Sequence, residues 1–138
     1  MKKKQQGLSL IELIIVIGIF GLVIVIGVVM LGNERARARD SQRIADMTKV
    51  QAAFQLLIFE KGSYLEAAQG CSEAGADIND CGLGRYLSGA DSLKDPSRFA
   101  YTITQVPDED NYRVQFTLER QYGTLAAGKH ILTEAGIQ

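Results

Sequence analysis

Residues 7–32 read GLSLIELIIVIGIFGLVIVIGVVMLG, and Glu12 is the only charged residue among them. From Leu13 to Gly32 the chain carries no charge at all. Twenty residues at about 1.5 Å each form roughly 30 Å of helix, which matches the hydrocarbon thickness of a bilayer. A secretory signal peptide would have a shorter apolar region followed by a cleavage site with small residues, and no such site follows here. The sequence therefore predicts a long helix whose first half, residues 8–32, spans a membrane once.

A short polar leader, residues 1–7, precedes this segment and contains three consecutive lysines. Positive charge favours the cytoplasmic side, but the four arginines between residues 35 and 43 leave the charge count alone undecided. Cys71 and Cys81 indicate which side the C-terminal part occupies: disulfides persist mainly outside the cytosol, so a bond between them would place that part outside. We expect a single-pass protein with its N-terminus in the cytoplasm and its C-terminal part outside.

Cys71 and Cys81 are the only two cysteines of the chain. A bond between them would close a short loop and stabilise the fold by roughly 3 kcal/mol on the chain-entropy model. The alternative is two unpaired small hydrophobic residues. Two cysteines without a nearby histidine make a poor metal site, so we expect a disulfide and no metal.

Residues 33–62 are expected to continue the helix, but as an amphipathic rather than an entirely apolar segment. No proline or glycine occurs between Asn33 and Lys61, and apolar residues recur at steps of three and four, which is typical of an amphipathic helix. Gly62 provides a stop. The apolar stripe comprises Ile44, Met47, Val50, Phe54, Leu57 and Ile58, and the residues expected mostly to face water are Arg43, Asp46, Lys49, Gln51 and Gln55.

Residues 63–138 are expected to form a globular head. The glycine-rich part up to Asp95 reads as an irregular loop that the disulfide holds. Beyond it, apolar and polar residues alternate over 99–103 and 112–118, on either side of a turn at 107–111, which predicts a β-hairpin. A third strand is expected around His130 to Thr133. The fold class is therefore α+β, with a long N-terminal helix packed against a small C-terminal antiparallel sheet.

Glu12 is the oddity of the apolar segment. An ionised carboxylate at the edge of hydrocarbon is costly unless it finds a partner or stays at the interface. Cleavage after Gly7 would create a new ammonium group on Leu8, four residues before Glu12. The two groups pair awkwardly within one chain, whereas pairing between neighbouring chains would neutralise both and fix an axial offset. The alternative is that Glu12 only marks the interfacial end of a membrane anchor, where the helix dipole favours it.

Gly7 to Leu13, directly after a lysine-rich leader, resembles the prepilin peptidase motif of type IV pilins and type II secretion pseudopilins. The resemblance implies cleavage after Gly7, N-methylation of Leu8 and assembly through Glu12. Leu8 stands where the family usually has Phe, and the late membrane helix lacks the proline of many members. The segment Leu93-Lys94-Asp95-Pro96 resembles one that precedes the sheet in major pseudopilins and small pilins.

The resemblance implies a structural filament subunit and no enzyme, catalytic residue or cofactor. Its partners would be copies of itself in a helical homopolymer, prepilin peptidase, an inner-membrane assembly platform with an ATPase motor, and membrane lipid before assembly. The filament would be a pilus serving adhesion, motility or DNA uptake, or alternatively the pseudopilus of a type II secretion system. A different class is a membrane-anchored binding module that does not polymerise.

Other candidate sites are weaker. His130, the only histidine, has no ligand cluster around it in sequence, and the acids at 108–110 suit a solvated turn better than a calcium site. Nucleic acid is not expected as a partner, because acids are interspersed among the arginines that follow the apolar segment. These arginines are expected to reach lipid headgroups or to pair with neighbouring subunits; they are Arg35, Arg37, Arg39 and Arg43.

Overall fold

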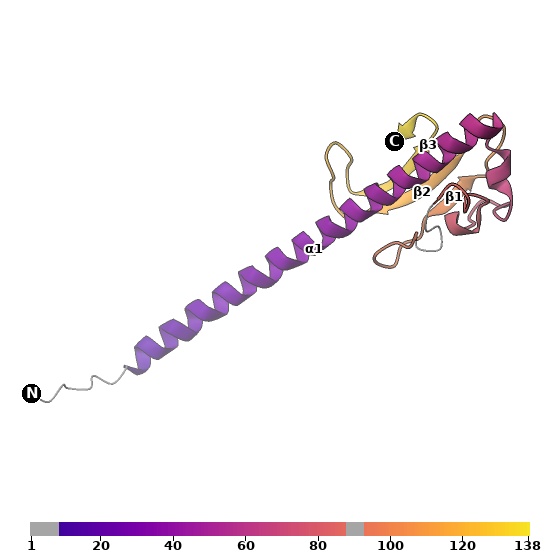
Figure 1. The fold of residues 1–138 in the computed structure, drawn as a ribbon. Helices are drawn as coiled ribbons and strands as arrows, with labels where there is room; N and C mark the ends of the chain where they lie inside the picture. The colour runs from indigo at the N-terminus through magenta and orange to yellow at the C-terminus, as the bar shows by residue number, and fades with distance from the viewer. Residues whose placement is uncertain (1–8, 88–92) are drawn as a thin grey trace, which may run out of the picture. The chain divides into compact units, whose positions relative to one another are not determined.

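The structure is a computed structural model that describes residues 9–87 and 93–138. Contacts divide the chain into two compact units, residues 1–35 and 36–138. From here on, the head means the second unit, which includes residues 36–61 of the helix as well as the predicted head at 63–138. Helix α1, Leu10–Lys61, begins in the first unit and ends in the head (Figure 1). The long uncharged segment and the proline-free stretch after it account for this helix.

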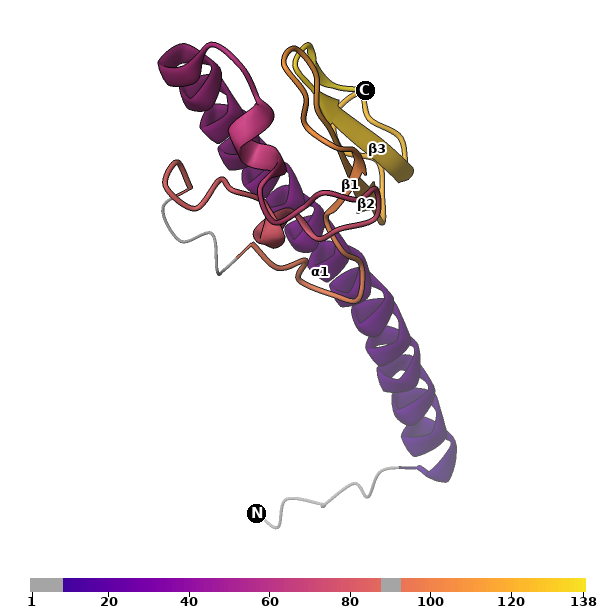
Figure 2. The ribbon, with the colours of Figure 1, turned by 90° about the vertical axis from the view of Figure 1, so that its right-hand side faces the viewer.

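The head contains a four-stranded antiparallel sheet in the order β1-β2-β3-β4. It lies along the C-terminal part of α1 (Figure 2). The predicted α+β fold, a long N-terminal helix with a small antiparallel sheet, is thus confirmed. The strands are β1, Thr102–Gln105; β2, Arg113–Leu118; β3, Gly128–Thr133; and β4, Gly136–Ile137, while the 3₁₀ turns η1 and η2 occupy Leu65–Ala68 and Ile78–Asp80.

The predicted hairpin and third strand are confirmed by β1, β2 and β3. Strand β1 begins only at Thr102, so Phe99 lies before the sheet and remains 40% exposed. Strand β4 was not predicted from the sequence. It has two residues, one of them a glycine, and so offers no alternation to read.

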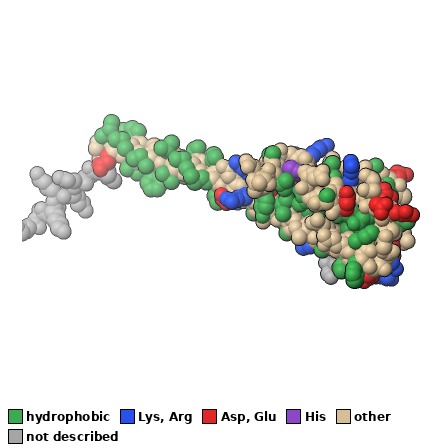
Figure 3. Space-filling view, turned by 90° about the horizontal axis from the view of Figure 1, so that it is seen from above, with side chains coloured by type: hydrophobic (Ala, Val, Ile, Leu, Met, Phe, Trp, Pro, Cys, Tyr) green, Lys and Arg blue, Asp and Glu red, His purple; other side chains and the backbone are tan. Residues whose placement is uncertain are grey.

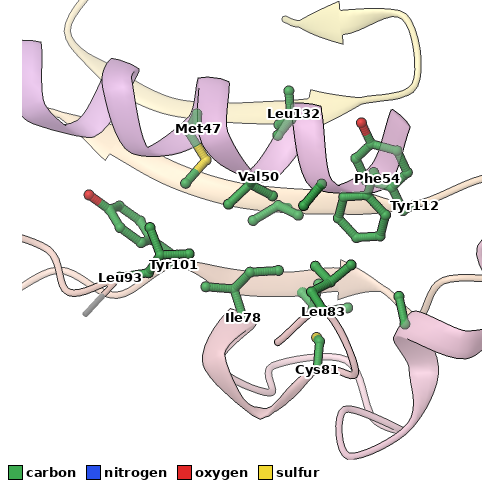
Figure 4. Close-up of a cluster of buried hydrophobic side chains, with 14 of the residues drawn as sticks. Met47, Val50, Phe54, Ile78, Cys81, Leu83, Leu93, Tyr101, Tyr112 and Leu132 are labelled. Carbon is green, nitrogen blue, oxygen red and sulfur yellow. The ribbon is translucent and has the colours of Figure 1, made fainter. Parts of the chain in front are cut away.

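The core of the head forms where α1 meets the sheet and the segment around Ile78 to Leu83 (Figure 4). Four of the six predicted stripe residues are fully buried, and Ile44 and Ile58 are partly buried against them. The Phe54 and Tyr112 rings stack with centroids 3.7 Å apart, and the Tyr64 ring meets both edge-on. The buried stripe residues are Met47, Val50, Phe54 and Leu57.

Helix α1 ends where Gly62 was expected to stop it. Gly62 adopts a φ of 73°, in the left-handed region that glycine tolerates best, and its N–H donates to the Ile58 carbonyl at 2.9 Å. The chain then turns, and the Tyr64 N–H donates to the Asp108 carbonyl at 3.1 Å, beside the β1–β2 turn.

The predicted disulfide between Cys71 and Cys81 is present. Glycines at its flanks allow the backbone to approach itself closely. A Cβ at Gly70 would lie 2.0 Å from the Asp80 carbonyl oxygen, and one at Gly82 would lie 2.4 Å from that of Glu66. The loop is therefore closed by backbone packing as well as by sulfur.

Two residues expected mostly to face water, Arg43 and Asp46, are buried instead. Asp46 accepts a hydrogen bond from the Tyr101 hydroxyl at 3.1 Å and pairs with Lys49. Helical periodicity alone assigned these positions to the solvent face, because it contains no information on the polar partners that later segments bring. Arg43 has several such partners.

Candidate functional site

The first unit presents an exposed apolar surface. Every large hydrophobic side chain from Leu10 to Leu31 is exposed, with fractions between 41% and 76%. Figure 3 shows these side chains covering the visible surface of this part of α1. Among the described residues, α1 is the one helix long and apolar enough to cross a membrane, and none of its most apolar window is buried. A core helix would be covered by its own chain, so this surface is compatible with membrane anchoring.

Glu12 lies in the first turn of α1, at the N-terminal end of the apolar surface, and is exposed. The helix starts with a hydrogen bond from the Leu13 N–H to the Ser9 carbonyl at 3.1 Å. A carboxylate in this turn is favoured by the helix dipole. The position of Glu12 is therefore compatible with both alternatives. It can mark the interfacial end of a membrane anchor, or its carboxylate can pair with a cation of another chain.

The predicted processing site, Gly7 and Leu8, lies outside the residues that the structure describes. The predicted pairing of Glu12 with the Leu8 ammonium group joins two different chains. Both therefore stay predictions.

The head contains a second polar constellation, which the sequence did not reveal. We call it the ion cluster; it centres on the guanidinium of Arg43, whose side chain is 0% exposed. The Arg43 Nε and Nη2 atoms donate to the two carboxylate oxygens of Asp95 at 2.6 and 3.0 Å. Its Nη1 donates to Asp40 at 2.6 Å. The cluster consists of Arg39, Asp40, Arg43, Asp95, Ser97 and Glu119.

The ion cluster fastens three segments together. The Asp40 carboxylate accepts hydrogen bonds from the backbone N–H groups of Glu119 at 2.9 Å and Arg120 at 2.8 Å, just after β2. Arg39 Nε donates to Glu119 at 2.7 Å, and Arg43 reaches the same carboxylate at 2.9 Å. Helix α1, the end of β2 and the segment around Asp95 are thus joined by charged groups that satisfy one another.

The electrostatics of the cluster follow from these bonds. The hydrogen bonds from Arg39, reinforced by Arg43, lower the pKa of Glu119 to about 2 despite its partial burial. Burial alone would raise the pKa of Asp95, but hydrogen bonds from Arg43 and Ser97 outweigh it and hold that pKa below its usual value. Glu119 and Asp95 therefore remain ionised at neutral pH.

The arginines behave differently from what was expected of them. Arg39 and Arg43 pair within their own chain, whereas Arg35 and Arg37 are exposed. The i,i+3 spacing of Asp40 and Arg43 was a readable signal for a local pair. The role of Asp95 was not readable, because it lies 52 residues from Arg43 in sequence.

The weaker candidates take structural positions. The His130 ring nitrogens lie 2.8 and 3.1 Å from the carbonyl oxygens of Ala126 and Gln138. The Asp108 carboxylate accepts hydrogen bonds from the backbone N–H groups of Asp110 and Asn111, and these bonds lower its pKa. Both arrangements suit residues that shape a loop.

Comparison with known proteins concerns the N-terminal part of the chain. Residues 2–32 match the family model described as "Prokaryotic N-terminal methylation motif". The match includes the leader, the predicted cleavage junction, Glu12 and the apolar segment. No solved structure matches the chain. The motif is characteristic of type IV pilins and pseudopilins, which are structural proteins, and the N-terminal part of this chain is similar to theirs.

Proposed function

We propose that this chain is the structural subunit of a type IV pilus-like filament. It is made as a membrane-inserted precursor, processed between Gly7 and Leu8, and polymerised through the N-terminal part of α1. The observation that carries the proposal is the exposed surface from Leu13 to Leu31, which lacks any charge and follows Glu12 within the matched motif. This surface needs lipid or other copies of itself to cover it.

Processing and assembly form one coupled step in this proposal. Cleavage after Gly7 releases the leader and leaves an ammonium group on Leu8. In an apolar surrounding an unpaired charge costs several kcal/mol, so this group and the Glu12 carboxylate of a neighbouring chain each relieve the cost of the other. Because the pair forms at one relative position, it fixes the axial offset of the incoming subunit.

The remaining apolar surface supplies adhesion between helices without setting a register. Lipid tails are as apolar as Leu or Ile, so exchanging lipid for a neighbouring helix gains mainly close packing. Gly18, Gly21 and Gly27 have no side chain to keep another helix at a distance. Apart from their chain neighbours and the adjoining helix backbone, no described atom lies within 4 Å of where their Cβ would be. The machinery implied by the family, an assembly platform and an ATPase motor, would supply the work of extraction.

Substitution of Glu12 by Ala tests the proposal. The variant should still insert and lose its leader, because the apolar segment and the cleavage junction are intact, but it should yield few sheared filaments. Glu34→Ala is the matched control, because it removes an exposed carboxylate of the same helix just beyond the apolar segment. Normal filament yield from the Glu12 variant would remove the central claim.

A secretion pseudopilus remains the second candidate function. The Leu93–Pro96 segment, whose Asp95 holds the buried guanidinium, resembles one found in major pseudopilins. The disulfide-closed loop instead favours a surface pilus. Immunogold labelling of intact cells separates the two, since a surface pilus is labelled without permeabilising the envelope and a short pseudopilus is not.

A further inference from the structure

We propose that one end of the head is a docking surface for anionic lipid headgroups. This surface, called the basic end, consists of Arg37, Lys94, Arg98 and Phe99, all of them exposed. The inference rests on the membrane insertion proposed above and goes beyond it, because it assigns the head its own contact with the bilayer.

The ion cluster brings the basic end together. Asp95 and Ser97 both bond to Arg43, which holds the segment from Lys94 to Phe99 against α1. The Phe99 ring covers this arginine, with its centroid 5.2 Å from the guanidinium carbon. Arg37 lies on α1 three residues before Asp40, another member of the cluster.

Charge is distributed unevenly along the head. Near the basic end, the carboxylates of Asp40, Asp95 and Glu119 are engaged by Arg39 and Arg43, so they do not neutralise the exposed cations. Asp77, in the pocket that Lys94 and Phe99 line, accepts hydrogen bonds from Asn79. Acidic side chains gather instead at the opposite end, around the β1–β2 turn, and Figure 3 shows several red groups, with some blue ones, at the right-hand end of the head. The acidic residues of that end are Asp108, Glu109, Asp110 and Glu134.

Strand β2 separates the two ends. It starts at Arg113, beside the acidic turn, and finishes at Leu118, next to the backbone groups that bind Asp40. At about 3.3 Å per residue, these ends are roughly 17 Å apart. That separation exceeds the Debye length of about 8 Å at physiological salt, so a partner at the basic end is largely screened from the acidic one.

The short link between the apolar segment and Arg37 makes the bilayer the favoured partner. Five residues separate Leu31, the last large residue of the apolar segment, from Arg37. Even fully extended, this link spans only about 20 Å. An apolar segment held in a bilayer therefore keeps Arg37 close to the headgroups, where anionic lipids attract Lys and Arg and an exposed aromatic ring finds an interfacial environment. Arg43, which holds the rest of the basic end to α1, follows Arg37 by six residues.

The chain has no tryptophan, so Phe99→Trp introduces a single fluorophore at the centre of the basic end. The full-length variant is reconstituted into vesicles of phosphatidylcholine, with or without a third of phosphatidylglycerol. We expect a blue-shifted emission and weaker acrylamide quenching in the anionic vesicles only. Because the attraction is electrostatic, molar salt should abolish the difference.

Two double variants in this background locate the contact. The double variant Lys94→Gln, Arg98→Gln removes two cations from the basic end. It should lower the equilibrium constant for contact between the basic end and the anionic surface by about thirtyfold. The double variant Lys61→Gln, Arg113→Gln makes the same change of charge near the acidic end. It should leave the blue shift and the weaker acrylamide quenching in anionic vesicles unchanged. Equal quenching in both kinds of vesicle, or equal effects of the two double variants, would overturn the proposal.

A measurement on the unsubstituted protein guards against misfolding of the tryptophan variant. Trypsin should cut after Lys94 and Arg98 more slowly in anionic vesicles, while cutting after Arg113 should not change. If cleavage after Lys94 and Arg98 slows in neutral vesicles as the protein-to-lipid ratio rises, the partner is a second copy of the chain. That result would contradict the lipid contact. Flotation of the vesicles reports insertion separately, so protein that fails to float refutes the proposed membrane insertion, whereas floating protein without protection refutes the lipid contact alone.

Discussion

Arg43 is the largest side chain that the described part of the head buries completely, and it is charged. Its guanidinium is stable there because Asp40, Asp95 and Glu119 surround it. Removing one partner of a buried ion pair leaves the others uncompensated, which is far more costly than losing a surface pair.

Arg43→Met should therefore lower the free energy of unfolding by about 3–5 kcal/mol. Arg37→Met removes an exposed arginine from the same helix and should change it by less than about 0.5 kcal/mol. Urea denaturation of the detergent-solubilised protein measures both values. Equal midpoints for the two variants would show that the ion cluster contributes nothing to stability.

Glu119 makes stability depend on pH in a defined direction. Its pKa in the folded head is about 2, below the ordinary value of 4.5, mainly because of the hydrogen bonds from Arg39. The contribution is thus fully present above about pH 4.5 and is lost as the pH falls toward 2. After allowance for partial exposure, it is on the order of 2 kcal/mol.

Urea denaturation at about pH 5 and about pH 2.5 checks this dependence, with Asp95 adding to it in the same direction. In Glu119→Gln the loss between these two pH values should be smaller than in the unsubstituted protein. An unchanged loss would mean that Glu119 is not the group that titrates.

At the scale of elements, the amphipathic half of α1 was the most predictable part of the head. Its stripe follows from helical periodicity, and the buried side of the helix contains the expected Met47, Val50, Phe54 and Leu57. The hairpin was predictable for the same reason, because alternation is visible within one segment. The ion cluster and β4 were not, since the first depends on pairing across long sequence distances and the second is too short to show a pattern.

Two phenylalanines of α1 provide a test of this helix face. Phe54 is fully buried and stacks on Tyr112, whereas Phe59 is 87% exposed. Phe54→Ala should lower the free energy of unfolding by about 3–5 kcal/mol. Phe59→Ala, the same change on the exposed face, should have little effect, and a comparable loss from both would contradict the packing of α1 on the sheet.

At the scale of the whole molecule, the two units have surfaces of different character. The first unit exposes an apolar helix that carries no charge from Leu13 to Gly32, whereas the head has its own core, its own ion cluster and a polar surface. The matched motif covers residues 2–32 of this unit, and the composition of the apolar segment alone predicted a membrane span, with which its exposed surface is compatible. The pairing of Glu12 with Leu8 was predicted from charge and resemblance, and it can only be tested in the assembled state.

We propose that the chain is processed after Gly7 and then leaves the membrane as a filament. Intact-mass spectrometry of the sheared surface fraction tests both parts in one measurement. We predict a subunit that begins at Leu8, carries one methyl group and keeps the Cys71–Cys81 disulfide. A chain that begins at Met1 in cells that make the peptidase, or one that is absent from the sheared fraction and present only in membranes, would contradict the account.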